Sequence, residues 1–271
     1  MYKLEQSRKK VGYLVSIILT GFIMLNQALC QPAPLKIGIS KASPNYVNWL
    51  KRSDPGVQTV DLYMMPIATA VQELGQCSGL LLTGGEDVYP GRYGHESDTL
   101  RCTEMNPHRD SLDMALIEKA LGLKMPVIGV CRGHQVLNVF LGGTLIIDIP
   151  EDFGKRITHQ CDDYLHCFHE VNVKKSSMLQ SISLCASAPV TTNHHQAVDQ
   201  LSPMLVSNAA SDDSLIEGIE WQNPENKSFL IGVQWHPERM DSSNPLSSRI
   251  AEEFLLHAAT YSINQLKINR E

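Results

Sequence analysis

The chain has 271 residues, of which 43% are hydrophobic, and it carries a formal net charge of -6 with a pI near 5.9. This length is enough for one sizeable α/β core without a second domain. The acidic balance excludes a basic surface for nucleic acid, so we predict no nucleic-acid partner. The sequence also contains no internal repeat and no low-complexity tract.

The first 30 residues have the pattern of an export signal. Basic residues at positions 3, 8, 9 and 10 precede a mostly apolar stretch, 11–25, and small residues follow at Ala28 and Cys30. This pattern predicts a signal peptide cleaved after Cys30 and an exported, periplasmic or secreted, mature protein. An uncleaved membrane anchor is the second choice, and acylation of Cys30 is a third that Leu29 disfavours. In each case residues 1–30 lie outside the fold, and 31–271 form one domain.

Strand-like and helix-like segments alternate from residue 35 onward. Strands are expected at 35–39, 57–63, 80–82 and 127–130, and helices at 46–51, 68–75, 109–123 and 134–141. Such alternation predicts an α/β fold with a single doubly wound, mostly parallel sheet flanked by helices. Beyond residue 148, extended segments are expected at 169–173, 189–192, 204–209, 215–220 and 229–233. A final helix at 245–261 has an apolar stripe that would pack on the sheet.

Cys131 lies at a predicted strand-to-helix turn. The apolar run 127–130 is typical of a buried strand, and apolar residues at helical spacing follow it. Gly129 and Gly133 flank the cysteine, because a strained turn needs neighbours without side chains. This is the logic of a nucleophile elbow with sulfur in place of oxygen, and the adjoining helix N-terminus favours the thiolate. Taken alone, Cys131 fits a buried structural cysteine equally well.

A second apolar run, 229–233, leads into Gln-Trp-His-Pro-Glu at 234–238. A cysteine nucleophile needs a base and the base needs an orienting acceptor, distant in sequence but adjacent in the fold. The carboxyl ends of the strands in an open α/β sheet border one crevice, so Cys131, His236 and Glu238 are expected to converge there. We predict that His236 is the base and that Glu238 orients its imidazole.

The sequence Gly-Val-Cys-Arg-Gly-His-Gln at 129–135, with Trp-His-Pro-Glu at 235–238, resembles the class I glutamine amidotransferase superfamily. Four further stretches, at 83–94, 109–113, 142–148 and 193–198, narrow the resemblance to the peptidase C26 branch of γ-glutamyl-γ-aminobutyrate hydrolase-like proteins. Together they cover most of the chain from residue 35, in the family's order. The resemblance implies a flavodoxin-like sheet of the class I glutamine amidotransferase type and a small γ-glutamyl substrate.

The same resemblance implies roles for residues around the nucleophile. Backbone N–H groups of Gly85 and Arg132 would form an oxyanion hole, since a tetrahedral intermediate needs donors aimed at its oxygen. Gln135, one helical turn past the nucleophile, would touch the glutamyl moiety. The substrate's α-amino and α-carboxylate groups would be bound by His194, His195 and Gln196. The alternatives are an ordinary turn at Gly85 and a surface histidine pair at 194–195.

Glu86, Asp87, Tyr93 and Arg109 are expected to shape the mouth of the pocket or to pair with one another. The sequence does not assign a role to His134. The cautious interpretation treats Glu86, Asp87, Tyr93 and Arg109 as loop structure.

Seven cysteines are present, at 30, 77, 102, 131, 161, 167 and 185, without the spacing of a zinc or thioredoxin site. Cys161 and Cys167 lie among three histidines, 159, 166 and 169, which suggests a metal cluster, but the spacings match no standard site. We therefore predict no metal and no cofactor. If the protein is exported, some cysteines would be bridged, while Cys131 should stay free.

These features predict a cysteine hydrolase that cleaves γ-glutamyl amide bonds through a thioester on Cys131 and releases glutamate and an amine. No synthetase or nucleotide-binding segment is visible in the 271 residues, which favours hydrolysis over amidotransfer. Two alternatives remain: the glutaminase subunit of a two-component amidotransferase, and a catalytically idle γ-glutamyl-binding protein. The identity of the leaving amine and the formation of a homodimer stay open.

Overall fold

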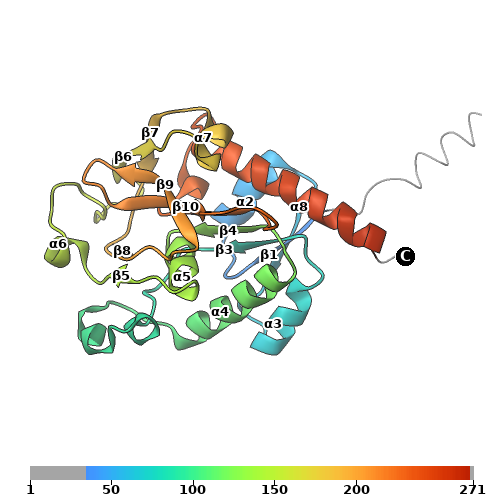
Figure 1. The fold of residues 1–271 in the computed structure, drawn as a ribbon, viewed down its shortest axis with the longest axis horizontal. Coiled ribbons are helices and arrows are strands. Elements are labelled where there is room, and N and C mark those ends of the chain that lie inside the picture. The colour runs from blue at the N-terminus through green and yellow to red at the C-terminus, as the bar shows by residue number, and fades with distance from the viewer. Residues whose placement is uncertain (1–34, 269–271) are drawn as a thin grey trace, which may run out of the picture. The chain divides into compact units, whose positions relative to one another are not determined.

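The computed structural model describes residues 35–268, so the predicted leader, 1–30, lies outside the described residues. Within 35–268, no helix combines the length and the apolar character needed to cross a membrane. These residues build one continuous β-sheet with helices on both of its faces (Figure 1).

One half of the sheet is parallel. It contains β1 (Lys36–Ile39), β2 (Gln58–Asp61), β3 (Gly79–Leu82), β4 (Val127–Val130) and β11 (Leu230–Val233), in the spatial order β2-β1-β3-β4-β11. The three central strands β3, β4 and β11 are buried along their whole length, as expected for strands covered on both faces. Parallel pairing places the carboxyl ends of β3, β4 and β11 next to one another.

The other half of the sheet is antiparallel and comes from the chain beyond residue 148. It continues from β11 through β10 (Ile216–Trp221), β9 (Leu205–Ser211), β6 (Phe168–Val173) and β7 (Ser187–Thr191). Two short strands, β5 (Leu145–Ile146) and β8 (Ala197–Val198), pair with each other, and β8 also pairs with β10. The sequence did not predict β5 and β8, because two residues are too few to show a periodic pattern.

Helices cover both faces of the sheet (Figure 1). On one face lie α2 (Pro44–Ser53), α7 (Met178–Ser183) and α8 (Ser248–Ile268). On the other lie α3 (Ile67–Leu74), α4 (Pro107–Gly122) and α5 (Arg132–Phe140). Shorter segments are α6 (Ile149–Asp152) and the 3₁₀ turns η1 (Pro90–Tyr93), η2 (Glu96–Arg101) and η3 (Pro237–Arg239). The predicted doubly wound α/β fold is confirmed, with a sheet that is parallel from β2 to β11 and antiparallel beyond β11.

Successive side chains of each strand point to opposite faces of the sheet, so the hydrophobic core has one part on each face. In β3, Leu81 joins the cluster beneath α2 and α8, whereas Leu80 and Leu82 join the cluster beneath α3, α4 and α5. Ile250 and Phe254 of α8 are fully buried, and the Phe254 ring packs so closely over Gly79 that a Cβ there would lie 2.8 Å from it. The predicted packing of the last helix on the sheet is therefore confirmed.

Candidate active site

Cys131 occupies the turn between β4 and α5. Its backbone has φ 51° and ψ -105°, a conformation that is strained for any residue with a side chain. The N–H of Cys131 donates to the carbonyl of Val233 at 2.8 Å, which fixes the turn against the end of β11. This is the strand-turn-helix geometry predicted from the sequence.

The two flanking glycines are required by close backbone approach. A Cβ on Gly129 would lie 2.5 Å from the carbonyl oxygen of Gly133, and one on Gly133 would lie 2.4 Å from that of Leu82. Real Cβ atoms do not come this close to backbone, so α5 can start this near to β3 and β4 only if both positions are glycine.

His236 and Glu238 follow β11, on the strand next to the nucleophile. The Nδ1 atom of His236 is 2.9 Å from Oε1 of Glu238, and both side chains are buried. The backbone N–H of His236 donates to the carbonyl of Thr191 at 2.9 Å, so the main chain at His236 is anchored to β7. Glu238 thus occupies Nδ1, so Nε2 is the nitrogen that remains for proton transfer with Cys131.

The charge state of His236 reflects this pairing. Burial by itself lowers the pKa of His236, but the carboxylate of Glu238 and the thiol of Cys131 together raise it to about 9. The pairing with Glu238 thus favours the imidazolium, the form of the base that a Cys–His nucleophile uses.

The loop after β3 passes directly beside this pair. A Cβ on Gly84 would lie 3.1 Å from Cε1 of His236 and 3.6 Å from Cβ of Cys131. The next residue, Gly85, has φ 154°, a value that side chains disfavour. The N–H of Arg132, as the first residue of α5, has no acceptor within the helix. The two N–H groups predicted for the oxyanion hole thus lie on segments that meet at the thiol.

A buried ion network supports both segments. Arg109 donates from Nη2 to the carbonyl of Thr83 at 3.0 Å and from Nε to Asp113 at 3.1 Å. The guanidinium of Arg132 contacts Asp113 and Asp110 behind the turn. Arg109 is fully buried. The expectation that it shapes the mouth of the pocket is therefore wrong. The role of Arg109 is to hold the 83–85 loop against α4.

A cavity of about 420 Å³ opens beside Cys131. Its walls include the residues predicted to contact the substrate: Gln135, His194, His195 and Gln196. They also include charged residues that the sequence did not assign to substrate, namely Lys41 and Glu104. Lys41 follows β1, so the rule that sites lie at the carboxyl ends of strands would have indicated it, whereas Glu104 lies in a loop without a pattern.

Charged pairs line the same cavity. Nε2 of His195 lies 2.9 Å from Asp87 Oδ1, and Nζ of Lys41 lies 2.6 Å from Glu86 Oε1. The hydrogen bond to Asp87 raises the pKa of His195 above its ordinary value. Burial alone would raise the pKa of Glu86, but the contact with Lys41 lowers it to about 2. Glu86 and Asp87 therefore line the cavity, as expected, but they pair with Lys41 and His195 and not with each other.

The remaining predicted substrate contacts are engaged with protein groups. Nε2 of Gln135 donates to the carbonyl of Gln196 at 3.0 Å, and Nε2 of Gln196 donates to the carbonyl of Ile147 at 3.2 Å. Oε1 of Gln196 is buried and has no partner within residues 35–268. His194 directs Nε2 toward Glu217.

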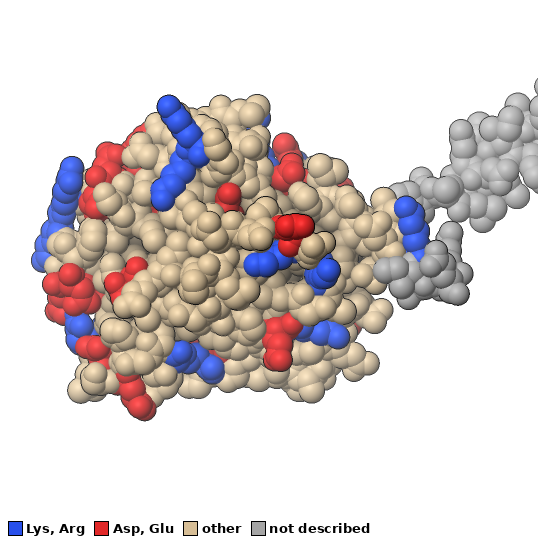
Figure 2. Space-filling model, in the orientation of Figure 1, with Lys and Arg blue, Asp and Glu red and all other residues tan. Residues whose placement is uncertain are grey.

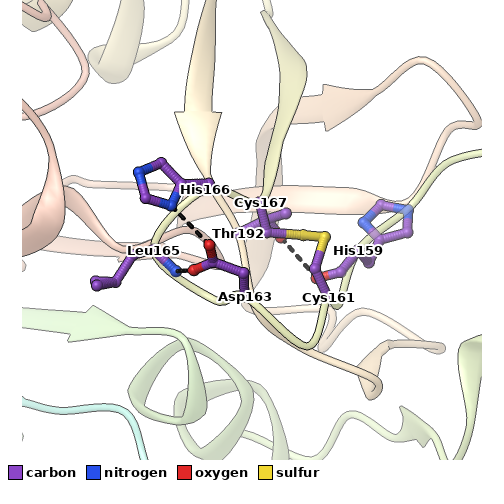
Figure 3. Close-up of a disulfide and its surroundings, with 7 residues drawn as sticks. All are labelled: His159, Cys161, Asp163, Leu165, His166, Cys167 and Thr192. Atoms are coloured by element: carbon purple, nitrogen blue, oxygen red, sulfur yellow. Dashed lines mark hydrogen bonds and ion pairs between the residues drawn. A yellow bond between two sulfur atoms is a disulfide. The ribbon is translucent and has the colours of Figure 1, made fainter.

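Cys161 and Cys167 form a disulfide, shown in Figure 3. A thiolate metal site on these two sulfurs is therefore excluded in this structure. His166 lies on the exposed turn of the same loop and pairs with Asp163 at 2.8 Å (Figure 3). Cys131 carries no disulfide, in line with the prediction that it stays free.

Charged side chains on the face shown in Figure 2 are of both signs and scattered among uncharged residues. Lysines and arginines do not form a stripe on this face. The absence of a nucleic-acid partner stays a prediction.

The fold defines the class of protein. The glutaminase domain of Trypanosoma brucei CTPS, solved with bound acivicin, superposes with a TM-score of 0.56 at 18% identity, over 83% of this chain and 94% of that one. At this identity the likeness concerns the fold alone, which is that of the class I glutamine amidotransferases. The predicted superfamily fold is confirmed.

The family follows from sequence comparison. The family model of peptidase C26 matches residues 40–238, so the chain belongs to the peptidase C26 family. Protein NtpR of Enterococcus hirae is 36% identical over 215 residues, covering 78% of this chain and 86% of that protein. γ-Glutamyl-γ-aminobutyrate hydrolase PuuD of Escherichia coli K12 is 33% identical over 192 residues, covering 68% and 73%. The predicted family membership is confirmed.

Proposed function

We propose that this protein hydrolyses γ-glutamyl amide bonds of small molecules through a covalent thioester on Cys131. The thiolate attacks the γ-carbonyl carbon, and the N–H groups of Gly85 and Arg132 stabilise the resulting oxyanion. As the tetrahedral intermediate collapses, the carbon–nitrogen bond breaks and His236 donates its proton to the leaving amine. His236 then takes a proton from water, which attacks the thioester, releases glutamate and restores the thiol.

The observation that carries this proposal is the arrangement of three side chains on two adjacent strands. A strained cysteine ends β4, and a His236–Glu238 pair held at 2.9 Å follows β11. Strain at a cysteine, with an imidazolium beside it and a carboxylate behind the imidazolium, has a clear use in nucleophilic catalysis. An idle binding protein would gain nothing from keeping all three.

The charges of the cavity suit a glutamyl group. A free α-amino group needs carboxylates, which Glu86, Asp87 and Glu104 supply, and an α-carboxylate needs cations, which Lys41 and His195 supply. These groups lie on the walls of the cavity that opens beside Cys131. The substrate's γ-carbonyl would then point toward the sulfur.

The similarity to PuuD, named a γ-glutamyl-γ-aminobutyrate hydrolase, supports a γ-glutamyl amine as the substrate class. The test is to incubate purified protein with γ-glutamyl-γ-aminobutyrate, other γ-glutamyl amines, γ-glutamyl peptides, a folate polyglutamate and glutamine, and to measure released glutamate. We expect kcat/KM to be highest for a γ-glutamyl amine. If only glutamine is turned over, the protein is a glutaminase, and if nothing is hydrolysed the proposal fails.

A further inference from the structure

Four ionisable side chains meet in the interior beside the active site, and one of them, His194, also lines the substrate cavity. His159 lies just before the disulfide loop, His169 on β6, His194 after β7, and Glu217 on β10. All four are buried, and Glu217 is 0% exposed. Four separate segments of chain thus contribute one polar group each to a single point.

The distances within this cluster are too long for hydrogen bonds. Oε1 of Glu217 lies 3.5 Å from Nδ1 of His159, 3.4 Å from Nε2 of His169 and 3.6 Å from Nε2 of His194. N–H···O bonds are ordinarily about 2.7–3.2 Å long. Within residues 35–268, none of these three nitrogens and neither oxygen of Glu217 has a hydrogen-bond partner. Such a concentration of unpaired buried polar atoms is costly unless something else satisfies them.

The opposite nitrogen of each ring shows which tautomer is present. Nε2 of His159 lies 3.0 Å from a carboxylate oxygen of Asp213. Nδ1 of His169 and Nδ1 of His194 lie 3.1 Å and 2.9 Å from backbone carbonyl oxygens, those of Glu170 and Gln196. Because these oxygens only accept, the nitrogens that face them carry the hydrogen. In the neutral rings the other nitrogens therefore present lone pairs to the carboxylate of Glu217.

We propose that these four side chains bind a divalent transition-metal ion, for which zinc is the best fit. Zinc bonds to imidazole nitrogen and carboxylate oxygen are about 2.0–2.2 Å long, so the ligand atoms of a regular tetrahedron lie about 3.4 Å apart. The three distances to Glu217 match that spacing, and all four ligand atoms lie within 4.8 Å of one another. Histidines whose second nitrogen donates to a carboxylate or carbonyl are the usual ligands of such ions. Four protein ligands leave no open position, which makes the site structural.

A proton would compete with the metal for the histidine nitrogens that face Glu217. A proton on His159 would pair one nitrogen with Glu217 and leave two lone pairs facing the carboxylate. Metal binding satisfies all three nitrogens and releases that proton.

An ion bound at this site would stabilise one wall of the substrate cavity. The carbonyl of Gln196 accepts from Nδ1 of His194 and also from Nε2 of Gln135, on the helix that begins at the nucleophile. The carbonyl of His159 accepts from the N–H of His194 at 2.9 Å and from Oγ1 of Thr192 at 3.0 Å. An ion bound here would therefore connect the 193–196 loop to β6, β10 and the disulfide loop. Figure 3 shows His159 beside this disulfide.

A second cavity lies beside the cluster. It has a volume of about 220 Å³, is bordered by His159 and His194 and lies next to α6.

The test uses the full chain with Cys131→Ser, so that the active-site thiol cannot bind the metal. This protein is stripped with a chelator and titrated with zinc chloride, and bound metal and Tm are measured. We expect one zinc per chain, a higher Tm with zinc, and with cobalt(II) the visible absorption of a tetrahedral site. Glu217→Gln keeps the shape and removes the charge, and it should weaken zinc binding by more than about 100-fold. His166→Ala, an exposed histidine on the same loop, is the matched control and should bind as before.

Two results would overturn the proposal. One is that neither zinc nor cobalt binds to the Cys131→Ser protein and Tm does not change. The other is that Glu217→Gln binds zinc as tightly as its parent, which would place the metal elsewhere. If Glu217→Gln does not fold, His169→Gln on β6 serves for the same measurement.

Discussion

Cys131 is the nucleophile of the proposed reaction, and the packing around it stabilises its strained backbone conformation. Cys131→Ser should retain the fold, because the two side chains are nearly isosteric, and should lower kcat by at least about 10³-fold. Steady-state kinetics and circular dichroism would measure both effects. Turnover within tenfold of the natural protein would show that sulfur is not the nucleophile.

The same thiol should be the one that reacts with a glutamine-like chloroketone. Burial raises the pKa of Cys77 to about 11, which makes that thiol inert at neutral pH, and burial also raises the pKa of Cys102. Peptide mapping after labelling should therefore find the adduct on Cys131. Equal labelling of Cys77 and Cys102 would contradict an activated thiol at the turn.

Substitution of His236 should lower kcat more than substitution of Glu238. His236→Ala removes the proton donor and acceptor, so kcat should fall by about 10²–10⁴-fold. Glu238→Gln keeps an acceptor 2.9 Å from Nδ1 but removes the charge that stabilises the imidazolium, so the loss should be smaller. KM should change little in either variant, because the predicted glutamyl contacts lie elsewhere. If the two variants are equally inactive and Glu238→Gln also unfolds, the carboxylate is structural and a Cys–His dyad remains.

His236 should also make stability depend on pH. Its pKa is raised from 6.5 to about 9 in the folded protein, so its stabilising contribution is complete below pH 6.5 and is lost as the pH rises through about 9. The shift corresponds to about 3 kcal/mol of unfolding free energy. Denaturant unfolding of the natural protein and of His236→Gln should show a difference that shrinks by this amount between about pH 6 and pH 10. A difference that does not change with pH would refute the raised pKa.

At the scale of the element, the close approach of α5 to β3 positions the nucleophile. A Cβ at Gly133 would lie 2.4 Å from the carbonyl oxygen of Leu82, so Gly133→Ala must push the first turn of α5 away from the sheet. We expect a loss of about 1–3 kcal/mol in stability and a loss of activity through displacement of Cys131. Chemical denaturation and kcat/KM would measure both.

The matched control for that substitution is Gly122→Ala. Gly122 is the last residue of α4, and a Cβ there meets nothing within 4 Å. Alanine should therefore be neutral or slightly stabilising, and activity should not change. If Gly133→Ala behaves like Gly122→Ala, the helix does not depend on that contact.

At the scale of the whole molecule, we propose that residues 1–30 direct export and that the mature chain begins near Gln31. The Cys161–Cys167 disulfide supports this proposal, since disulfides persist in oxidising compartments. Mass spectrometry of protein from the native host should find this N-terminus and, without added reductant, the intact bridge. A soluble pool with Met1 retained and both cysteines reduced would refute the proposal. A mature chain that keeps residues 1–30 in the membrane would favour the anchor instead.

The sequence by itself determined the alternating α/β order, because buried strands and amphipathic helices have different periods. It also predicted the strand-turn-helix at Cys131 and the position of His236 and Glu238 after a second strand, because parallel strands end at one edge of the sheet. These features are local patterns joined by one rule of topology. The roles of the three residues remain proposals that the experiments above address.

Only the tertiary structure decided which polar side chains that are far apart in sequence contact one another. Arg109 and Asp113 are four residues apart on α4, a spacing that indicates their pairing. The contacts of Asp113 with Arg132 and of Arg109 with Thr83 depend on the packing of α4 against α5 and the 83–85 loop, which no spacing in the sequence shows. The sequence associated His159 and His169 with two cysteines because those residues are close along the chain. In the fold the cysteines bond to each other, and the antiparallel strands bring His194 and Glu217 to the two histidines instead. Contacts between residues far apart in sequence depend on strand order and register, which hydrophobic periodicity does not specify.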